Sequence, residues 1–517
     1  MKTSLLQKNK HLLILAIILI FAASLRMFRI LNYQQPVFAD EAIYVRWAQV
    51  MRSVPELRFL PLTDGKQPLF MWSVIPFFKL FTDPLIAGRM ISVVTGLTSL
   101  VGIYYLSYSL FASKKAALVA SILYAVSPFA VFFDSVALVD SMLSMFGIWV
   151  LLFSLLTVKF HRSDYAMLTG FALGGAFLTK SPAIYFALLI PSTWFFAKWQ
   201  KGLKNKVLGL MKLVFLFLPT YIIAFGMYNI LRLGPNFYML SSRSKDYLFP
   251  LSHVIENPFD PLIPFLDRTL EWLWIWGPAL LVPLAVFSLI TYFKKFPKQI
   301  FVIMLWLFVP LIISAEYVKV FTARYVFYIF PPLVVLASLV FEKKLNKILS
   351  VLLVMFIGHS LYINFLLSTD IEKAPFPRSE RMGYLEEWTA GYGIREVFQY
   401  IENNYINNPQ KKIVVGTEGY FGTLPDGLQI YLNKYPEITV IGVGLGLTEV
   451  PQSLKESKEA GNKTYLVINN SRLNLKKSPE ETGLKLIHEY PKALRGPGSH
   501  EFHNLGPQEK LFFFEVI

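Results

Sequence analysis

The chain has 517 residues, of which 54% are hydrophobic and only 16% charged, and its mean hydropathy is +0.48. These values exclude an ordinary soluble protein and indicate a membrane protein. The net charge of +16 does not indicate a nucleic-acid partner, because residues 370–517 hold 17 basic and 19 acidic residues and the whole basic excess lies in the hydrophobic part.

The chain contains no cysteine. This composition excludes disulfides, thiolate nucleophiles and cysteine-ligated metals. Histidines number only seven and show no ligand spacing, so we expect no metal.

The first apolar run, residues 11–24, follows a basic N-terminus. It could pass for a signal peptide, but the many later apolar runs favour an uncleaved first span. In either case the basic N-terminus lies in the cytoplasm and the residues after the run lie outside.

Two adjacent carboxylates, Asp40 and Glu41, follow this first span within the stretch 38–47, FADEAIYVRW. A carboxylate near hydrocarbon is costly unless it has a partner or a task. A solvated loop is the alternative explanation. On a helix the two side chains point in different directions, so we do not expect them to share one role.

Apolar runs recur from about residue 85, and with the first they predict about 11 transmembrane helices. Several are shorter than a usual span. The predicted spans are 85–111, 116–133, 138–158, 165–179, 182–198, 207–230, 272–293, 299–314, 322–341 and 347–368.

Basic residues fall in alternate loops, as the positive-inside rule requires. The basic loops, which we assign to the cytoplasm, contain Lys114 and Lys115, residues 159–162, residues 198–206, Lys294, Lys295 and Lys298, and Lys343 and Lys344. The other face then receives the long loops 32–83 and 231–271 and everything after Asp370.

Residues 370–517 change character and predict a small extracytoplasmic α/β domain beside a transmembrane domain, 1–369. A helix is expected from Glu386 to Asn404 and another from Leu424 to Leu432. The predicted strands are Ile413–Val415, Ile438–Val443, Tyr465–Ile468, Leu484–Ile487 and Leu511–Val516.

Carboxylates, lysines and arginines thus collect at span ends on the external face. Such a face suits transfer of a sugar from a polyprenyl phosphate, which needs a base for the acceptor hydroxyl and cations for the departing phosphate. A transporter or flippase of lipid-linked sugars is the alternative, although it should place charges near the bilayer midplane. An O-antigen ligase or polymerase would lack the acidic pair.

The motifs in these loops resemble GT-C glycosyltransferases of the protein O-mannosyltransferase and aminoarabinose (lipid A) transferase type. The resemblance covers roughly residues 10–340 and implies a polytopic, mainly α GT-C fold. It rests on the acidic pair, Gly65-Lys-Gln-Pro-Leu69, Gly88-Arg89, Asp140-Ser-Met142, Leu178-Thr-Lys-Ser-Pro182 and Thr322-Ala-Arg-Tyr325 followed by Pro331-Pro332.

The resemblance implies roles for particular residues. Asp40 would be the catalytic base or a carboxylate that orients the acceptor, and Glu41 a supporting carboxylate. Asp140 would be a second carboxylate near the site, although Asp134 departs from the pattern and could take its place. Lys66 would hold the donor phosphate, with Arg324 a second candidate, and Lys180 and Tyr325 would be further substrate-binding residues. Arg324 could instead snorkel at the interface and Lys180 could anchor a span boundary.

The expected protein is therefore a multi-pass glycosyltransferase of the cell envelope that transfers a hexose or pentose without a cofactor or metal. Its partners would be a polyprenyl-phosphate sugar, membrane lipids and a protein, lipid or wall acceptor. In the loop 231–271, Arg232, Arg243, Lys245 and His253 are equal candidates for contacts with donor or acceptor.

Overall fold

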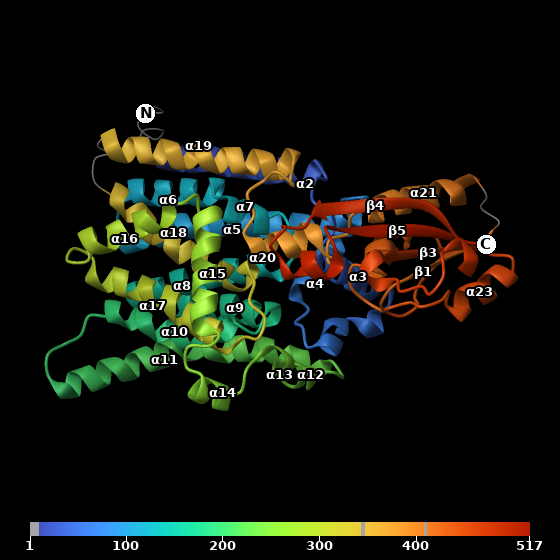
Figure 1. Ribbon diagram of the computed structural model, residues 1–517. Helices are drawn as coiled ribbons and strands as arrows, with labels where there is room; N and C mark the ends of the chain where they lie inside the picture. Colours follow the sequence, from blue (N-terminus) through green and yellow to red (C-terminus); the bar gives the residue numbers. More distant parts are fainter. Residues whose placement is uncertain (1–9, 343–346, 408–410) are drawn as a thin grey trace, which may run out of the picture. The chain divides into compact units, whose positions relative to one another are not determined.

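The computed structural model describes residues 10–342, 347–407 and 411–517. Lys343 and Lys344, which the sequence places in a basic loop, lie outside the described residues. The chain forms two compact units (Figure 1). The first consists of residues 1–32, 54–73 and 89–377, and the second of residues 33–53, 74–88 and 378–517.

The first unit is helical, as its apolar sequence predicts. Its longer helices are α2 (Lys10–Leu31), α5 (Pro84–Phe111), α6 (Lys114–Val126), α8 (Val139–Phe160), α9 (Ser163–Thr179), α11 (Leu203–Tyr228), α15 (Leu262–Ile275), α16 (Leu281–Tyr292), α17 (Pro297–Tyr317) and α19 (Lys347–Thr369). Shorter helices between them are α4 (Leu69–Val74), α7 (Pro128–Phe133), α10 (Ala183–Leu189), α12 (Met239–Ser242), α13 (Ser244–Tyr247), α14 (Leu251–Glu256) and α18 (Phe330–Ser338).

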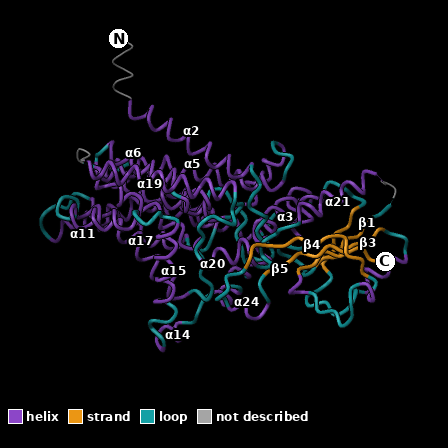
Figure 2. The backbone as a smooth tube through the Cα atoms, turned by 45° about the horizontal axis from the view of Figure 1, so that its top comes forward, coloured by secondary structure: helices purple, strands orange, loops and turns teal. Residues whose placement is uncertain are grey.

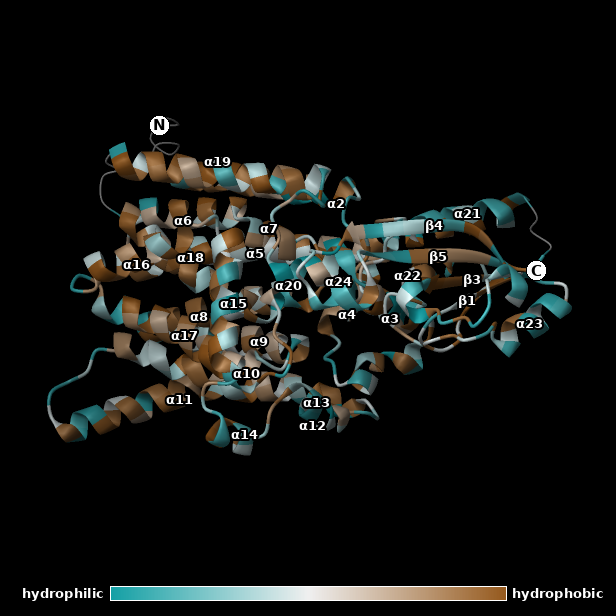
Figure 3. Ribbon diagram, viewed as in Figure 1, coloured by the Kyte–Doolittle hydropathy of each residue, from teal (hydrophilic) through white to brown (hydrophobic). Residues whose placement is uncertain are grey.

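Seven helical segments within the described ranges are long and apolar enough to cross a membrane. The outward faces of α11 and α19 carry large apolar side chains, for example Phe215 at 67% and Val354 at 68% exposure. Figure 3 shows the ribbons of both helices coloured largely as hydrophobic. Lipid is the environment in which such faces are stable, so the chain is a multi-pass membrane protein.

The predicted number of about 11 spans is not confirmed. Several predicted runs are broken in the structure, because Pro and Gly interrupt them. The run 116–133 divides at Ser127-Pro128 into α6 and α7, and the run 272–293 divides at Gly277-Pro278 between α15 and α16.

The second unit contains all five named strands (Figure 2). The sheet has the order β2-β1-β3-β5-β4. Its strands are β1 (Ile413–Thr417), β2 (Ile438–Gly442), β3 (Lys463–Asn469), β4 (Leu484–Leu494) and β5 (Gln508–Val516). β1 pairs in parallel with β2 and β3, whereas β5 is antiparallel to both β3 and β4. The five predicted strands are therefore confirmed.

Helices accompany this sheet: α20 (Arg378–Arg381), α21 (Ile394–Asn407), α22 (Asp426–Leu432), α23 (Gln452–Glu459) and α24 (His500–Leu505). The helix predicted from Glu386 begins only at Ile394. The cause is Gly393, which has φ +83 and whose added Cβ would lie 2.5 Å from the ring of Tyr490.

Helix α3 (Ala39–Ser53), which carries the acidic pair, belongs to the second unit. Arg46 donates to Asn433 Oδ1 at 2.6 Å and Gln49 donates to the backbone oxygen of Ile430 at 2.8 Å. The backbone of Gly391 also donates to Val37 O at 2.8 Å. The segment after the first span and the C-terminal residues thus fold together, while the predicted division at residue 369 into separate domains stays a prediction.

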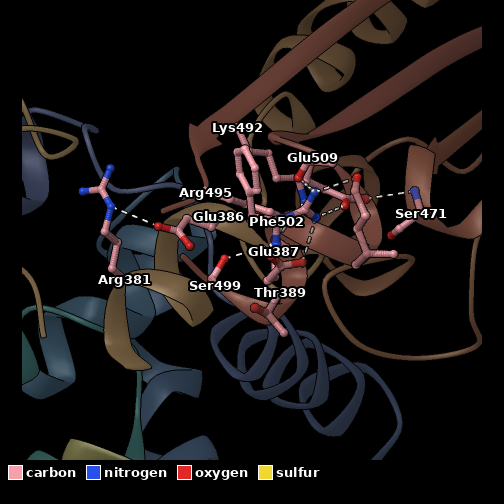
Figure 4. Close-up of polar contacts among 12 residues, drawn as sticks. Arg381, Glu386, Glu387, Thr389, Ser471, Lys492, Arg495, Ser499, Phe502 and Glu509 are labelled. Carbon is pink, nitrogen blue, oxygen red and sulfur yellow. Dashed lines mark hydrogen bonds and ion pairs between the residues drawn. The ribbon is translucent and has the colours of Figure 1, made fainter. Parts of the chain in front are cut away.

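A buried ionic cluster braces one end of the sheet (Figure 4). Arg495 is fully buried and donates to Glu387, with Nε–Oε1 at 2.7 Å, and also to Glu509. Lys492 donates to the backbone oxygen of Glu387 at 3.0 Å, and its burial lowers its pKa to about 8.

Replacing Arg495 with methionine should leave two carboxylates without their cation, one of them fully buried. The expected loss of unfolding free energy is about 3–5 kcal/mol. Lys510→Met is the matched control, because the Lys510–Glu489 pair is exposed and should contribute about 0–1 kcal/mol. Denaturant midpoints of both variants in one detergent give the comparison, and equal midpoints would contradict the bracing role.

Candidate active site

Lys66 lies in a tight turn of the first unit that only glycine allows. Gly65 has φ +66, and an added Cβ would lie 2.8 Å from the Cβ of Arg243 and 2.9 Å from the Met239 oxygen. Gly65 therefore serves both the backbone conformation and the close approach of the loop 231–271. Below this turn, Leu62 packs with Leu178 and Leu231.

Asp64 joins two cations at this turn. Its carboxylate lies 3.1 Å from Lys66 Nζ and 2.8 Å from Arg243 Nη2. Of the four cationic or histidine candidates in the loop 231–271, Arg243 is thus the one that reaches the partner of Lys66. The sequence offers one signal for this pairing, the acid directly before Gly65-Lys66.

The segments around Lys66 and Lys180 meet through their neighbours. Gln67 Nε2 donates to Ser181 Oγ at 2.9 Å, and Gln67 is buried. The two predicted motifs, Gly65–Leu69 and Leu178–Pro182, are therefore adjacent in the first unit, although their first residues lie 113 positions apart in the sequence.

Lys180 connects this pair of motifs to two others. Its Nζ lies 2.6 Å from Asp140 Oδ1 and 4.2 Å from the ring centroid of Tyr325. The guanidinium of Arg324 lies over the same ring at 5.1 Å. The Lys180 side chain is 22% exposed and that of Asp140 is 2% exposed. Lys180 therefore takes part in this cluster.

Asp140 and Asp134, which the sequence left as alternatives, have different surroundings. Asp140 Oδ2 is buried and has no hydrogen-bond partner among the described residues. Asp134 is fully buried, and its Oδ2 accepts from Arg26 Nη2 at 2.8 Å while its Oδ1 accepts from Ser141 at 2.6 Å and Tyr124 at 3.3 Å. The geometry favours Asp140 as the carboxylate of the site and gives Asp134 a structural task.

The acidic pair lies in the second unit, at the first turn of α3. Glu41 is fully buried, and its Oε2 accepts from the backbone nitrogen of Phe38 at 3.1 Å, as a capping carboxylate does. Asp40 is half-buried. The two carboxylates thus have different tasks, and Asp40 is the one that solvent or a ligand can reach.

Metal-binding geometry is not found in the described ranges, where no three His, Asp or Glu side chains gather as ligands. Metal independence stays a prediction.

Comparisons with known proteins give a partial match in sequence. Residues 65–223 match the family model described as dolichyl-phosphate-mannose-protein mannosyltransferase. The matched segment contains Lys66, Asp140 and Lys180 but neither Asp40 nor Arg324. No curated protein sequence matches the chain significantly.

Solved structures match over nearly the whole chain. ArnT from Cupriavidus metallidurans in the apo state has a TM-score of 0.56 and 14% identity, with 97% of this chain and 98% of that chain covered. The same protein bound to undecaprenyl phosphate gives 0.55, with 14% identity and the same coverage. The oligosaccharyltransferase of Archaeoglobus fulgidus, tethered to an acceptor peptide, gives 0.50 at 14% identity, with 90% of this chain and 69% of that chain covered.

Asp134→Asn should remove the charge that neutralises fully buried Arg26 and cost about 3–5 kcal/mol of unfolding free energy. Asp140→Asn should cost only about 1 kcal/mol, because its partner Lys180 is partly exposed and water can solvate it. Unfolding midpoints of the two variants in one detergent measure the difference. A larger loss for Asp140→Asn would reverse the assignment of the two aspartates.

Proposed function

The chain has the GT-C fold of glycosyltransferases of the protein O-mannosyltransferase and aminoarabinose transferase type, and from this premise we propose that it moves a sugar from a polyprenyl-phosphate donor to a hydroxyl acceptor. The reaction takes place on the extracytoplasmic face, where the loops 32–83 and 231–271 and residues 370–517 lie. The N-terminus lies in the cytoplasm. The sugar is a hexose or pentose, and the acceptor is a protein, lipid or wall polymer.

One observation carries this proposal: three separate motifs form one cluster of Lys180, Asp140, Tyr325 and Arg324. The motif of Lys66 adjoins this cluster in the same unit, because Gln67 donates to Ser181. Cations held by packing and ion pairs are suited to a phosphate, whose negative charge grows as the sugar leaves. The neighbour from Cupriavidus metallidurans binds undecaprenyl phosphate, a ligand of this class. Neither the family model nor the solved structures support a transporter.

In the proposed reaction the Asp40 carboxylate accepts the proton of the acceptor hydroxyl. The acceptor oxygen bonds to the anomeric carbon while the bond from that carbon to the phosphate oxygen breaks. Polyprenyl phosphate leaves with both electrons of that bond, and Lys66 with Arg324 and Lys180 stabilises the added charge. Glu41 supports Asp40 by capping the first turn of α3.

Asp40→Asn keeps the shape of the side chain and removes the base. Single-turnover transfer of a radiolabelled polyprenyl-phosphate sugar in nanodiscs should fall by roughly two to four orders of magnitude, while donor affinity stays unchanged. Asp164→Asn, in an exposed pair with Arg162, is the matched control. Near-normal turnover of Asp40→Asn would remove the acidic pair from the reaction.

Lys66→Ala should weaken donor binding by about 1.5–3 kcal/mol, the scale of a charged hydrogen bond. Transfer should also slow, because the leaving phosphate loses part of its stabilisation. Donor binding and single-turnover transfer are measured on the same nanodisc sample. Lys206→Ala, an exposed lysine of α11, is the control. Unchanged donor affinity in Lys66→Ala would exclude this lysine from the phosphate site.

A further inference from the structure

A pocket of about 580 Å³ lies within the second unit. Four segments line it: the end of α3, the stretch from Phe78 to Pro84, one face of α21 and the end of α22 with the residues that follow. Its volume falls in the range of small-molecule sites, roughly 300–1,000 Å³. None of the residues proposed for the transfer reaction lines it.

Aromatic rings form the apolar part of this pocket. Phe78 and Phe81 come from one side, and Phe398 and Tyr431 from another. Phe398 and Tyr431 stack with ring centroids 5.2 Å apart, which fixes their positions. Phe78 and Phe81 are half-buried, and aromatic faces of this kind are suited to the C–H faces of a sugar ring, whose hydroxyls must still meet polar groups.

Polar groups that can meet hydroxyls lie between these rings. Asn433 accepts from Arg46 through its carbonyl oxygen, so its NH₂ group is the part that can donate to a ligand. Glu402 accepts from Lys434 and Tyr435 through Oε1, and its Oε2 can accept from a hydroxyl. A planar amide, a carboxylate and aromatic rings together match the mixed surface of a saccharide.

Among the charged side chains that line the pocket, cations outnumber carboxylates by one. Arg395 lies 3.5 Å from Asp83, and Lys434 lies 2.7 Å from Glu402. Arg52, at the end of α3, has no ion pair with any carboxylate among the described residues. The pocket therefore favours a ligand that carries negative charge.

We propose that this pocket binds an acidic saccharide, a sugar that bears a carboxylate or a phosphate, and that it holds this part of the acceptor. The acceptor role rests on the proposed function. Pro84, the first residue of the membrane-spanning helix α5, lines the pocket, so a ligand there lies at the end of a span. This is the depth of lipid head groups, where an acceptor on a membrane-bound carrier would be presented.

Binding of three sugars to the full chain in nanodiscs tests the proposal. Glucuronic acid and glucose 6-phosphate should each bind about tenfold more tightly than glucose. If only one of them does, that sugar identifies the charged group that the pocket binds. Arg52→Gln should lower the affinity of the acidic sugars to that of glucose, whereas Arg52→Lys should restore most of it. Lys485→Gln, an exposed lysine on β4, should change nothing.

Equal affinities for the three sugars, or no binding by any of them, would overturn the proposal, and both results come from the unmodified chain. Binding of polyprenyl phosphate is measured on the same samples. Donor binding without sugar binding contradicts the pocket inference alone. Sugar binding without donor binding contradicts the proposed function and, with it, the acceptor role.

Discussion

The buried contact between Arg26 and Asp134 is the interaction on which one end of the helical unit depends. Arg26 lies on α2, Asp134 follows α7, and the same carboxylate accepts from Tyr124 on α6 and Ser141 on α8. Thr95 on α5 donates to Ser141 at 2.9 Å. One carboxylate thereby ties together helices that lie far apart in sequence, in surroundings where a broken buried pair is costly.

This network explains how Asp140 can stay incompletely bonded. Ser141, the next residue, is fixed by Asp134 and Thr95, so the first turn of α8 holds Asp140 beside Lys180. The second oxygen of Asp140 is then buried without a donor. A buried carboxylate oxygen without a donor is expected where a ligand can supply the missing hydrogen bond. Asp134 and Asp140, six positions apart, thus differ in hydrogen bonding: both oxygens of Asp134 accept hydrogen bonds, whereas one oxygen of Asp140 accepts none from the described residues.

Much of this organisation could be predicted from the sequence. Strand positions in the C-terminal part follow from short β-branched and aromatic runs, and the strands form where those runs lie. For Lys180, Asp140 and Tyr325 the sequence predicts only that they lie on the same face of the membrane, and their mutual contacts come from the structure. Arg243 and Asp64 were not distinguished from other charged loop residues, because their pairing depends on a turn at Gly65 that brings distant segments together.

Two features of the structure could not be predicted from the sequence. The association of α3 with the C-terminal sheet domain rests on side-chain bonds such as Arg46 to Asn433, which connect segments hundreds of residues apart. The pocket beside α3 is lined by four separate segments, so no local pattern marks it. Local periodicity predicts elements, whereas long-range polar contacts decide which elements share a unit.

We propose that the cations around Lys66 and Lys180 hold the phosphate of a lipid donor. An experimental structure of the full chain in nanodiscs with polyprenyl phosphate tests it most directly. Phosphate oxygens are expected at about 2.7–3.0 Å from the side-chain nitrogens of Lys66 and of Lys180 or Arg324. Phosphate bound elsewhere, with these side chains unchanged, would contradict it.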